Sequence, residues 1–166
     1  LKGVPIIKKK KGGRRTGNKV DDQLYQWVNH NKISKYPDPK FTELKKVLKQ
    51  QGWTPVYSQL DLGCTSLRLG TRVDLICENK DGELILVELK CGFDDYYDIG
   101  NQGNMLAPFD DIETTFRHKH YLQLLFTSWL FCHCSHKYSD RILKDSYILH
   151  IYNDNNNNIV SEVDVL

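Results

Sequence analysis

The stretch DLICENKDGELILVELK, residues 74–90, contains two apolar runs separated by the polar turn sequence NKDG. Gly82 stands where a short hairpin turn needs a left-handed residue, so the two runs are predicted to form antiparallel strands. Side chains alternate between the two faces of a strand, which puts Glu88 and Lys90 on one face. Folding about the turn brings Asp74 opposite Glu88 or the residue before it. We therefore expect two carboxylates and one ammonium group at one end of a sheet.

The apolar run that precedes Glu88 favours a site over a chance cluster of charges. LILVE, residues 84–88, is continuous, as is typical of a central strand, and such strands seldom end in charge. A long loop and a helix follow, so the charges lie at the carboxyl end of a strand, where α/β sheets place their sites. The alternative is a surface salt bridge in which Lys90 balances Glu88.

Two neighbouring acids and a lysine suit one kind of chemistry. Carboxylate oxygens bind Mg²⁺ or Mn²⁺, which keep several waters when one or two carboxylates hold them. A cation in such a site polarises a phosphoryl oxygen and lowers the pKa of a bound water. A lysine beside it can orient that water or neutralise charge in the transition state. The residues thus favour hydrolysis of a phosphodiester bond.

The rest of the chain predicts one mixed α/β domain over residues 16–166, with the order helices, three strands, a helix and two strands. The further elements expected are a helix from Thr16, a helix that Asp38 caps and that ends near Gly52, a strand over 53–63, a helix that begins at Thr114 or Thr115, and a closing hairpin about NDNNNN. The segment 121–132 of the third helix is apolar nearly all round, so we expect it to be buried. The loop over 91–113 is long enough to be functional or disordered.

Composition sets limits on the class of protein. The chain has 166 residues, 40% hydrophobic and 27% charged, which is typical of a globular domain. No apolar stretch approaches the ~20 residues of a membrane span. The five cysteines have no framework spacing, which favours a reduced, intracellular setting.

Positive charge gathers near the start of the chain, although the net charge is only +2. We assign residues 1–15 to a flexible basic arm. A solvated tail, a phosphate-binding arm and a nuclear address all fit this run. The residues predicted to bind nucleic acid there are Lys8, Lys9, Lys10, Lys11, Arg14 and Arg15. Arg117 and Lys119 begin the third helix and could also meet phosphates, since helix N-termini favour anions, or could simply be solvated.

Asp, a spacer of ~10–20 residues and Glu-x-Lys at the end of an apolar strand form a pattern that resembles the PD-(D/E)XK nuclease superfamily. The chain is most similar to its RecB-like and lambda-exonuclease-like branch over roughly residues 16–130. GNKVDDQL, residues 17–24, resembles that branch's first helix, with Asp21 where many members have His. HYLQLLFTSWLF, residues 120–131, resembles its Gln-bearing helix, with Gln123 matching and Thr127 replacing the usual tyrosine. PFDDIETTFRHKHYLQL, residues 108–124, also resembles nucleases encoded by large DNA viruses and mobile elements.

The resemblance implies a restriction-endonuclease-like fold and a role for each matching residue. Asp74, Glu88 and the backbone carbonyl of Leu89 would bind Mg²⁺ or Mn²⁺, and Asp21 would be an additional or second-metal ligand. Lys90 would position the attacking water, and Gln123 would orient Lys90 or a phosphate.

The implied activity is hydrolysis of DNA, single-stranded or at duplex ends, and we expect an exonuclease of replication, repair or recombination. Such an activity implies a nucleus or another intracellular compartment that contains DNA. A catalytically inactive nucleic-acid-binding domain and a protein-interaction module are the alternatives.

Overall fold

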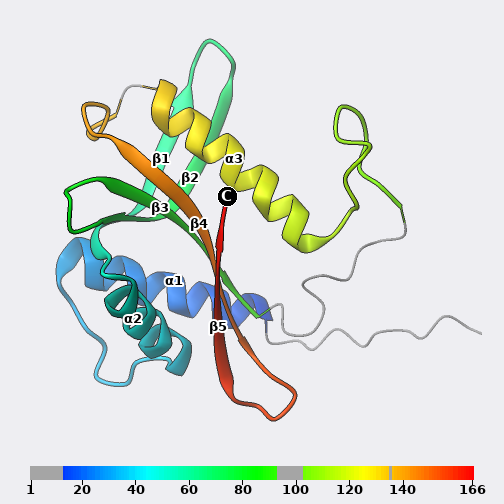
Figure 1. Ribbon diagram of the computed structural model, residues 1–166. Coiled ribbons are helices and arrows are strands. Elements are labelled where there is room, and N and C mark those ends of the chain that lie inside the picture. Colours follow the sequence, from blue (N-terminus) through cyan, green and yellow to red (C-terminus); the bar gives the residue numbers. More distant parts are fainter. Residues whose placement is uncertain (1–12, 93–102, 135) are drawn as a thin grey trace, which may run out of the picture.

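The computed structural model describes residues 13–92, 103–134 and 136–166. It has an α/β fold, as predicted, with helices and strands in the expected order (Figure 1). The elements are α1 (Gly13–His30), α2 (Pro39–Gln51), β1 (Thr54–Cys64), β2 (Leu69–Glu78), β3 (Leu84–Cys91), α3 (Phe116–His133), β4 (Leu143–Asn153) and β5 (Ile159–Val165).

The five strands form one mixed sheet in the order β1-β2-β3-β4-β5, with β3 in the middle. β3 and β4 are parallel, and every other neighbouring pair is antiparallel. The hairpin predicted about NKDG is confirmed: Gly82 has a φ of 78°, and Leu75 pairs with Val87. The next positions in this register are Asp74 and Glu88, so the two acids lie side by side on neighbouring strands.

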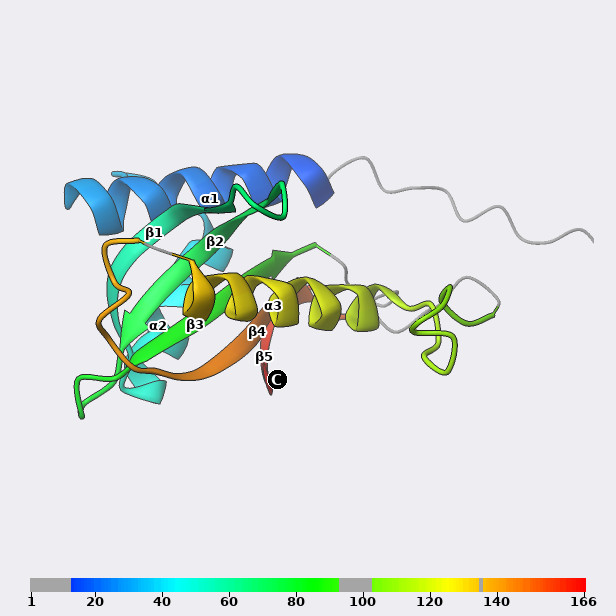
Figure 2. The ribbon, with the colours of Figure 1, turned by 90° about the horizontal axis from the view of Figure 1, so that it is seen from above.

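The helices cover both faces of the sheet. Figure 2 shows α1 and α3 on opposite sides of strands β1 and β2. One apolar cluster joins α1 and α2 to the side chains of Leu75 and Val87, and a second joins α3 to those of Ile76 and Leu86. Glu88 and Lys90 alternate with Val87 and Leu89 of the first cluster, so their strand positions belong to the α3 face.

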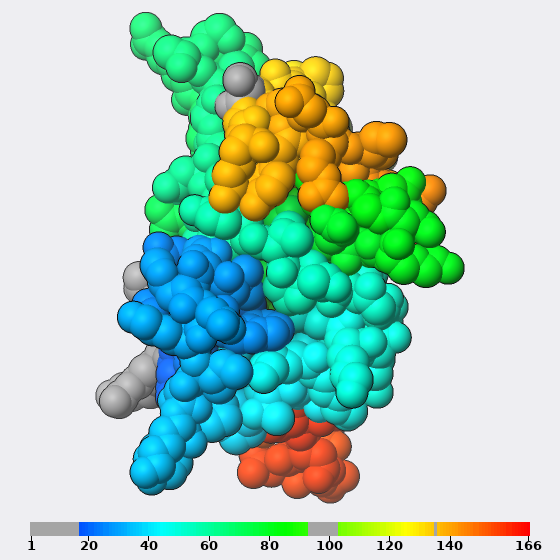
Figure 3. Space-filling model, turned by 90° about the vertical axis from the view of Figure 1, so that its left-hand side faces the viewer, coloured from blue at the N-terminus to red at the C-terminus, as the bar shows by residue number. Residues whose placement is uncertain are grey.

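Helices α1 and α2 lie side by side on one side of the molecule, where the β4–β5 turn projects beyond them (Figure 3). α1 begins at Gly13, three residues before the predicted start, and buries Val20 and Leu24. α2 has the predicted caps: the Asp38 side chain accepts a hydrogen bond from the Lys40 N–H, and Gly52 closes the helix with a φ of 69°. The two caps fix where α2 begins and ends and therefore where β1 starts.

The burial predicted for α3 is wrong. The side chains that it buries are those of Leu124, Thr127, Leu130 and Phe131. Leu125, Phe126 and Trp129 are 49%, 51% and 41% exposed. One face of α3 packs on the sheet, and no other element in the described part of the chain covers its outer face. Within these residues, none of the helices combines the length and the apolar character that crossing a bilayer requires.

Candidate active site at the end of the central strand

Five side chains predicted for the site come from four elements that meet at one end of β3. β2 supplies Asp74, β3 supplies Glu88 and Lys90, α3 supplies Gln123, and α1 supplies Asp21. Gly17 places the start of α1 against β3, because a Cβ there would lie 4.0 Å from the carbonyl oxygen of Cys91. Side chains from helices on both faces of the sheet can therefore reach this end of β3.

Glu88 is the most deeply buried of these residues, with 1% of its surface exposed. Its Oε1 atom accepts hydrogen bonds from the Lys90 Nζ and the Gln123 Nε2, each at 2.5 Å. The Gln123 Oε1 lies 3.5 Å from the Lys90 Nζ, so the three side chains contact one another. A buried carboxylate is costly unless it is paired, and here an ammonium and an amide share one of its oxygens.

Asp74 is held in place through its carboxylate and its backbone. Its Oδ2 accepts a hydrogen bond of 2.9 Å from the Leu89 N–H, and its carbonyl accepts one of 3.0 Å from the buried Ser58 hydroxyl. Burial raises the pKa of Asp74 to about 7; the charge of Glu88 adds to this rise, while Lys90 and the Leu89 N–H oppose it. The site thus contains a carboxyl group that is poorly solvated and lies beside another acid.

Asp21 faces the same group of charges from α1. Burial raises its pKa to about 6, with Lys90 lowering it and the charges of Asp22 and Glu88 raising it further. Asp22, one position along, is exposed. The helix therefore turns Asp21, and not its neighbour, toward the charges at the end of β3.

The chemistry of these donors fits a hard cation, although their present arrangement does not form a closed cage. Carboxylate oxygens are the ligands that Mg²⁺ prefers. Burial, and to a smaller extent neighbouring acids, raise the pKa of Asp21 and of Asp74, so a bound cation would stabilise their ionised forms. Within the described residues, no three His, Cys, Asp or Glu side chains converge closely enough to hold a metal ion. Glu88 instead directs one oxygen to Lys90 and Gln123.

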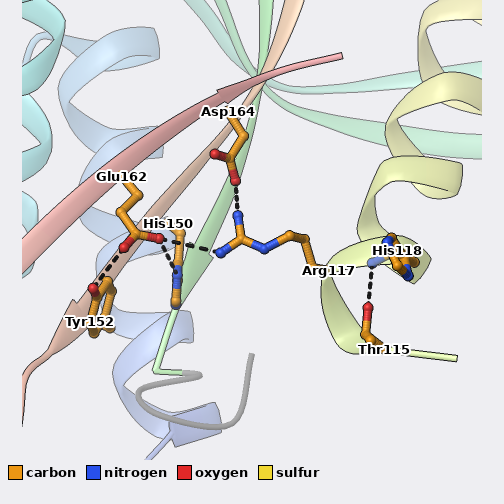
Figure 4. A network of polar contacts seen from close by, with 7 residues as sticks. All are labelled: Thr115, Arg117, His118, His150, Tyr152, Glu162 and Asp164. Atoms are coloured by element: carbon orange, nitrogen blue, oxygen red, sulfur yellow. Dashed lines mark hydrogen bonds and ion pairs between the residues drawn. The ribbon is translucent and has the colours of Figure 1, made fainter. Parts of the chain in front are cut away.

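Among the described residues, those predicted to bind phosphate interact with side chains other than the acids of the site. Lys8 to Lys11 lie outside the described residues, as do the side chains of Arg14 and Arg15. Lys119 is exposed, with its Nζ 5.6 Å from the centre of the Phe116 ring. Arg117 is ion-paired with Asp164 and Glu162 of β5 (Figure 4), so a phosphate would have to compete with two carboxylates for its guanidinium.

Two histidines join the site that the sequence interpretation did not assign to it. His150 of β4 is buried and stands opposite Lys90 in the parallel register, with its Nδ1 3.9 Å from the Glu162 Oε2. His120 precedes Gln123 by one helical turn; burial, followed by the charges of Lys90 and His150, lowers its pKa to about 3. The spacing of His120 and Gln123 could have suggested a shared face, whereas His150 required the β3–β4 register.

Gln59 of β1 also lies next to the acids. Its flanking residues Ser58 and Leu60 pair with Leu75 and Val73, which places Gln59 beside Asp74. Its φ of 60° is unusual for a strand residue and marks an irregular point of β1 next to the site.

Comparison of the chain with protein-family models, curated proteins and solved structures found no match.

Proposed function

We propose that this chain is a metal-dependent nuclease with a restriction-endonuclease-like fold that hydrolyses DNA phosphodiester bonds. The observation that carries the proposal is the meeting of Asp74, Glu88, Lys90 and Gln123 at the carboxyl end of the central strand, with Asp21 facing them from α1. A structural salt bridge would need only Glu88 and Lys90. Two further acids with raised pKa values have no role in such a bridge and lower stability when they ionise.

In this proposal Asp74, Glu88 and the Leu89 carbonyl would hold Mg²⁺ or Mn²⁺, and Asp21 would extend the set of oxygen ligands. The cation supplies a polarised phosphoryl oxygen and a water of lowered pKa. Lys90 then orients the attacking water, and Gln123 keeps the ammonium group in place through its amide oxygen.

Protonation links this activity to pH. Because the pKa of Asp74 is about 7 and that of Asp21 about 6, both carboxyls must lose protons before they can bind a cation. The proposal therefore requires more Mg²⁺ for half-maximal cleavage at pH 6 than at pH 8. The wild-type protein tests this dependence without any substitution.

The experiment that tests the function compares end-labelled linear, nicked and circular DNA, each incubated with Mg²⁺ or with EDTA. Asp74→Asn, Glu88→Gln and Lys90→Ala should each abolish cleavage. Asp81→Asn is the matched control, because Asp81 is an exposed acid in the turn of the same hairpin. Cleavage of linear DNA alone would indicate an exonuclease.

Two results would count against the proposal. Cleavage at the wild-type rate by any of the three variants would remove that residue from the site. DNA binding with no cleavage under any divalent cation would favour the catalytically inactive nucleic-acid-binding alternative.

A further inference from the structure

The outer face of α3 presents aromatic rings to solvent. We define this surface by Lys119, Phe126, Trp129 and His133. Phe126 and Trp129 are 51% and 41% exposed, and the Trp129 ring stacks on that of His133 with centroids 4.7 Å apart and planes inclined by 16°. Exposed single apolar residues are common, but two large rings on adjacent turns form a continuous surface.

This surface runs past the candidate active site, because Gln123 lies between Lys119 and the two rings along α3. Gln123, which donates to Glu88, lies on the same helix and is itself exposed. With 100° per residue and a rise of 1.5 Å, Phe126 lies about 60° round the helix axis and about 4.5 Å along it from Gln123, and Trp129 lies about 120° round and about 9 Å along it from Gln123. An extended ligand bound at the end of β3 would therefore meet both rings if it continued round and along α3.

The charge of the helix favours an anionic partner. α3 contains no Asp or Glu over its 18 residues, while Arg117 and Lys119 lie near its first turn. Arg117 is paired with acids, but the ammonium of Lys119 is exposed on the defined surface. Exposed aromatic rings beside a cation are the features with which proteins bind single-stranded nucleic acid, because bases stack on the rings and phosphates meet the charge.

We propose that the outer face of α3 binds a single-stranded segment of nucleic acid that runs past the active site, with its phosphates near Lys119 on one side of Gln123 and its bases stacked on Phe126 and Trp129 on the other. This inference rests on the proposed nuclease function and specifies its substrate as DNA with unpaired nucleotides. A duplex is excluded from this surface, since its base faces are already stacked on one another.

The test measures binding in EDTA, where the proposed cleavage cannot occur. Fluorescence anisotropy would compare a labelled single-stranded oligonucleotide with a duplex of the same sequence. Phe126→Ala and Trp129→Ala should each weaken single-strand binding by about 5- to 100-fold, the range that base stacking on a ring supplies. Affinity for the duplex should change less than about 2-fold, and Trp129→Phe should retain most single-strand affinity because it keeps a ring.

Leu125→Ala is the matched control. Leu125 is 49% exposed on the same helix but has no ring, so its loss should leave single-strand affinity within about 2-fold of wild type. Thermal melts would show that the variants remain folded, as is expected for exposed positions. An equal loss in Leu125→Ala would overturn stacking as the source of affinity.

The failures of the two proposals are distinguishable. Unchanged single-strand affinity in the Phe126→Ala/Trp129→Ala double variant would overturn the binding surface, even if the protein cleaves DNA. If light scattering then showed a wild-type dimer and a monomeric double variant, the surface would be an interface between copies of this chain. Ring-dependent binding without Mg²⁺-dependent cleavage would instead overturn the nuclease proposal and leave the surface standing.

Discussion

Replacing Asp74 by Asn should stabilise the metal-free protein at pH 8 while it abolishes cleavage. Asn keeps the shape of the side chain and an oxygen that can accept the hydrogen bond from the Leu89 N–H. It removes a negative charge that is poorly solvated and lies beside Glu88. The substitution therefore removes the free-energy cost of the buried charge while it keeps the shape and the hydrogen bond of the side chain.

The pKa of Asp74 determines the size and the pH range of this effect. Folding raises the pKa from 3.8 to about 7, so the folded state holds the proton more tightly than the unfolded state. The stability associated with this proton is fully present below pH 3.8 and is lost as the pH rises to about 7. At roughly 1.4 kcal/mol per pKa unit, the loss at pH 8 is on the order of 4 kcal/mol. The Asn variant does not lose this stability, because its side chain does not ionise.

Urea unfolding of both proteins in EDTA at several pH values measures the difference. The Asn variant should exceed the wild type by several kcal/mol at pH 8, by less at pH 5, and by almost nothing near pH 3. A gap of 4 kcal/mol corresponds to roughly 10 °C in Tm for a domain of this size, so thermal melts provide a second readout.

Two outcomes would refute the reasoning. An Asn variant no more stable than wild type at pH 8 would mean that the Asp74 carboxylate is well accommodated and that no cation is needed to offset it. A gap that stayed constant from pH 4 to pH 8 would mean that it arises from packing and not from ionisation.

Three further predictions concern the surroundings of Asp74. Asp21→Ala should lower the cleavage rate at least ~100-fold in single-turnover assays, a barrier change of about 2.7 kcal/mol, whereas Asp22→Ala should be close to neutral. The reverse result would mean that Asp22, and not Asp21, is the α1 residue that acts at the site. Millimolar Mg²⁺ should raise the Tm of wild type at pH 8 but hardly that of Asp74→Asn, since a ligand stabilises only the state that binds it; equal shifts in differential scanning fluorimetry would place the cation elsewhere. Asn29→Ala should cost about 1–3 kcal/mol in urea unfolding, because its side chain exchanges hydrogen bonds of 2.8 and 2.9 Å with the backbone of Ser58; a loss below 0.5 kcal/mol would show that these bonds contribute little.

Local signals in the sequence were sufficient for the elements that carry the acids. The turn residues about Gly82 and the alternation around Glu88 predicted the β2–β3 hairpin, and the register between Leu75 and Val87 follows the prediction. The caps of α2 could be predicted equally well, because Asp38 and Gly52 act through contacts with residues close to them in the sequence.

The parts that the sequence could not predict depend on contacts between distant segments. The apolar composition of α3 does not reveal which of its faces meets the sheet, so the exposure of Phe126 and Trp129 was missed. The nearness of His150 to Lys90 follows from the parallel β3–β4 register, which no local pattern encodes. The pairing of Arg117 with β5 likewise depends on where the closing hairpin docks.

The mixed direction of the sheet has a consequence for the order in which the chain folds. β1, β2 and β3 follow one another through short turns. Asp74 and Glu88 therefore approach each other as soon as the β2–β3 hairpin forms. The parallel partner β4 and the helix that carries Gln123 require closure of a much longer loop, which is entropically costlier and slower. On the ribosome, the acids would therefore be brought together before the amide that contacts Glu88 has emerged. A nascent chain that ends after β3 would therefore hold two neighbouring carboxylates without the amide that later contacts Glu88.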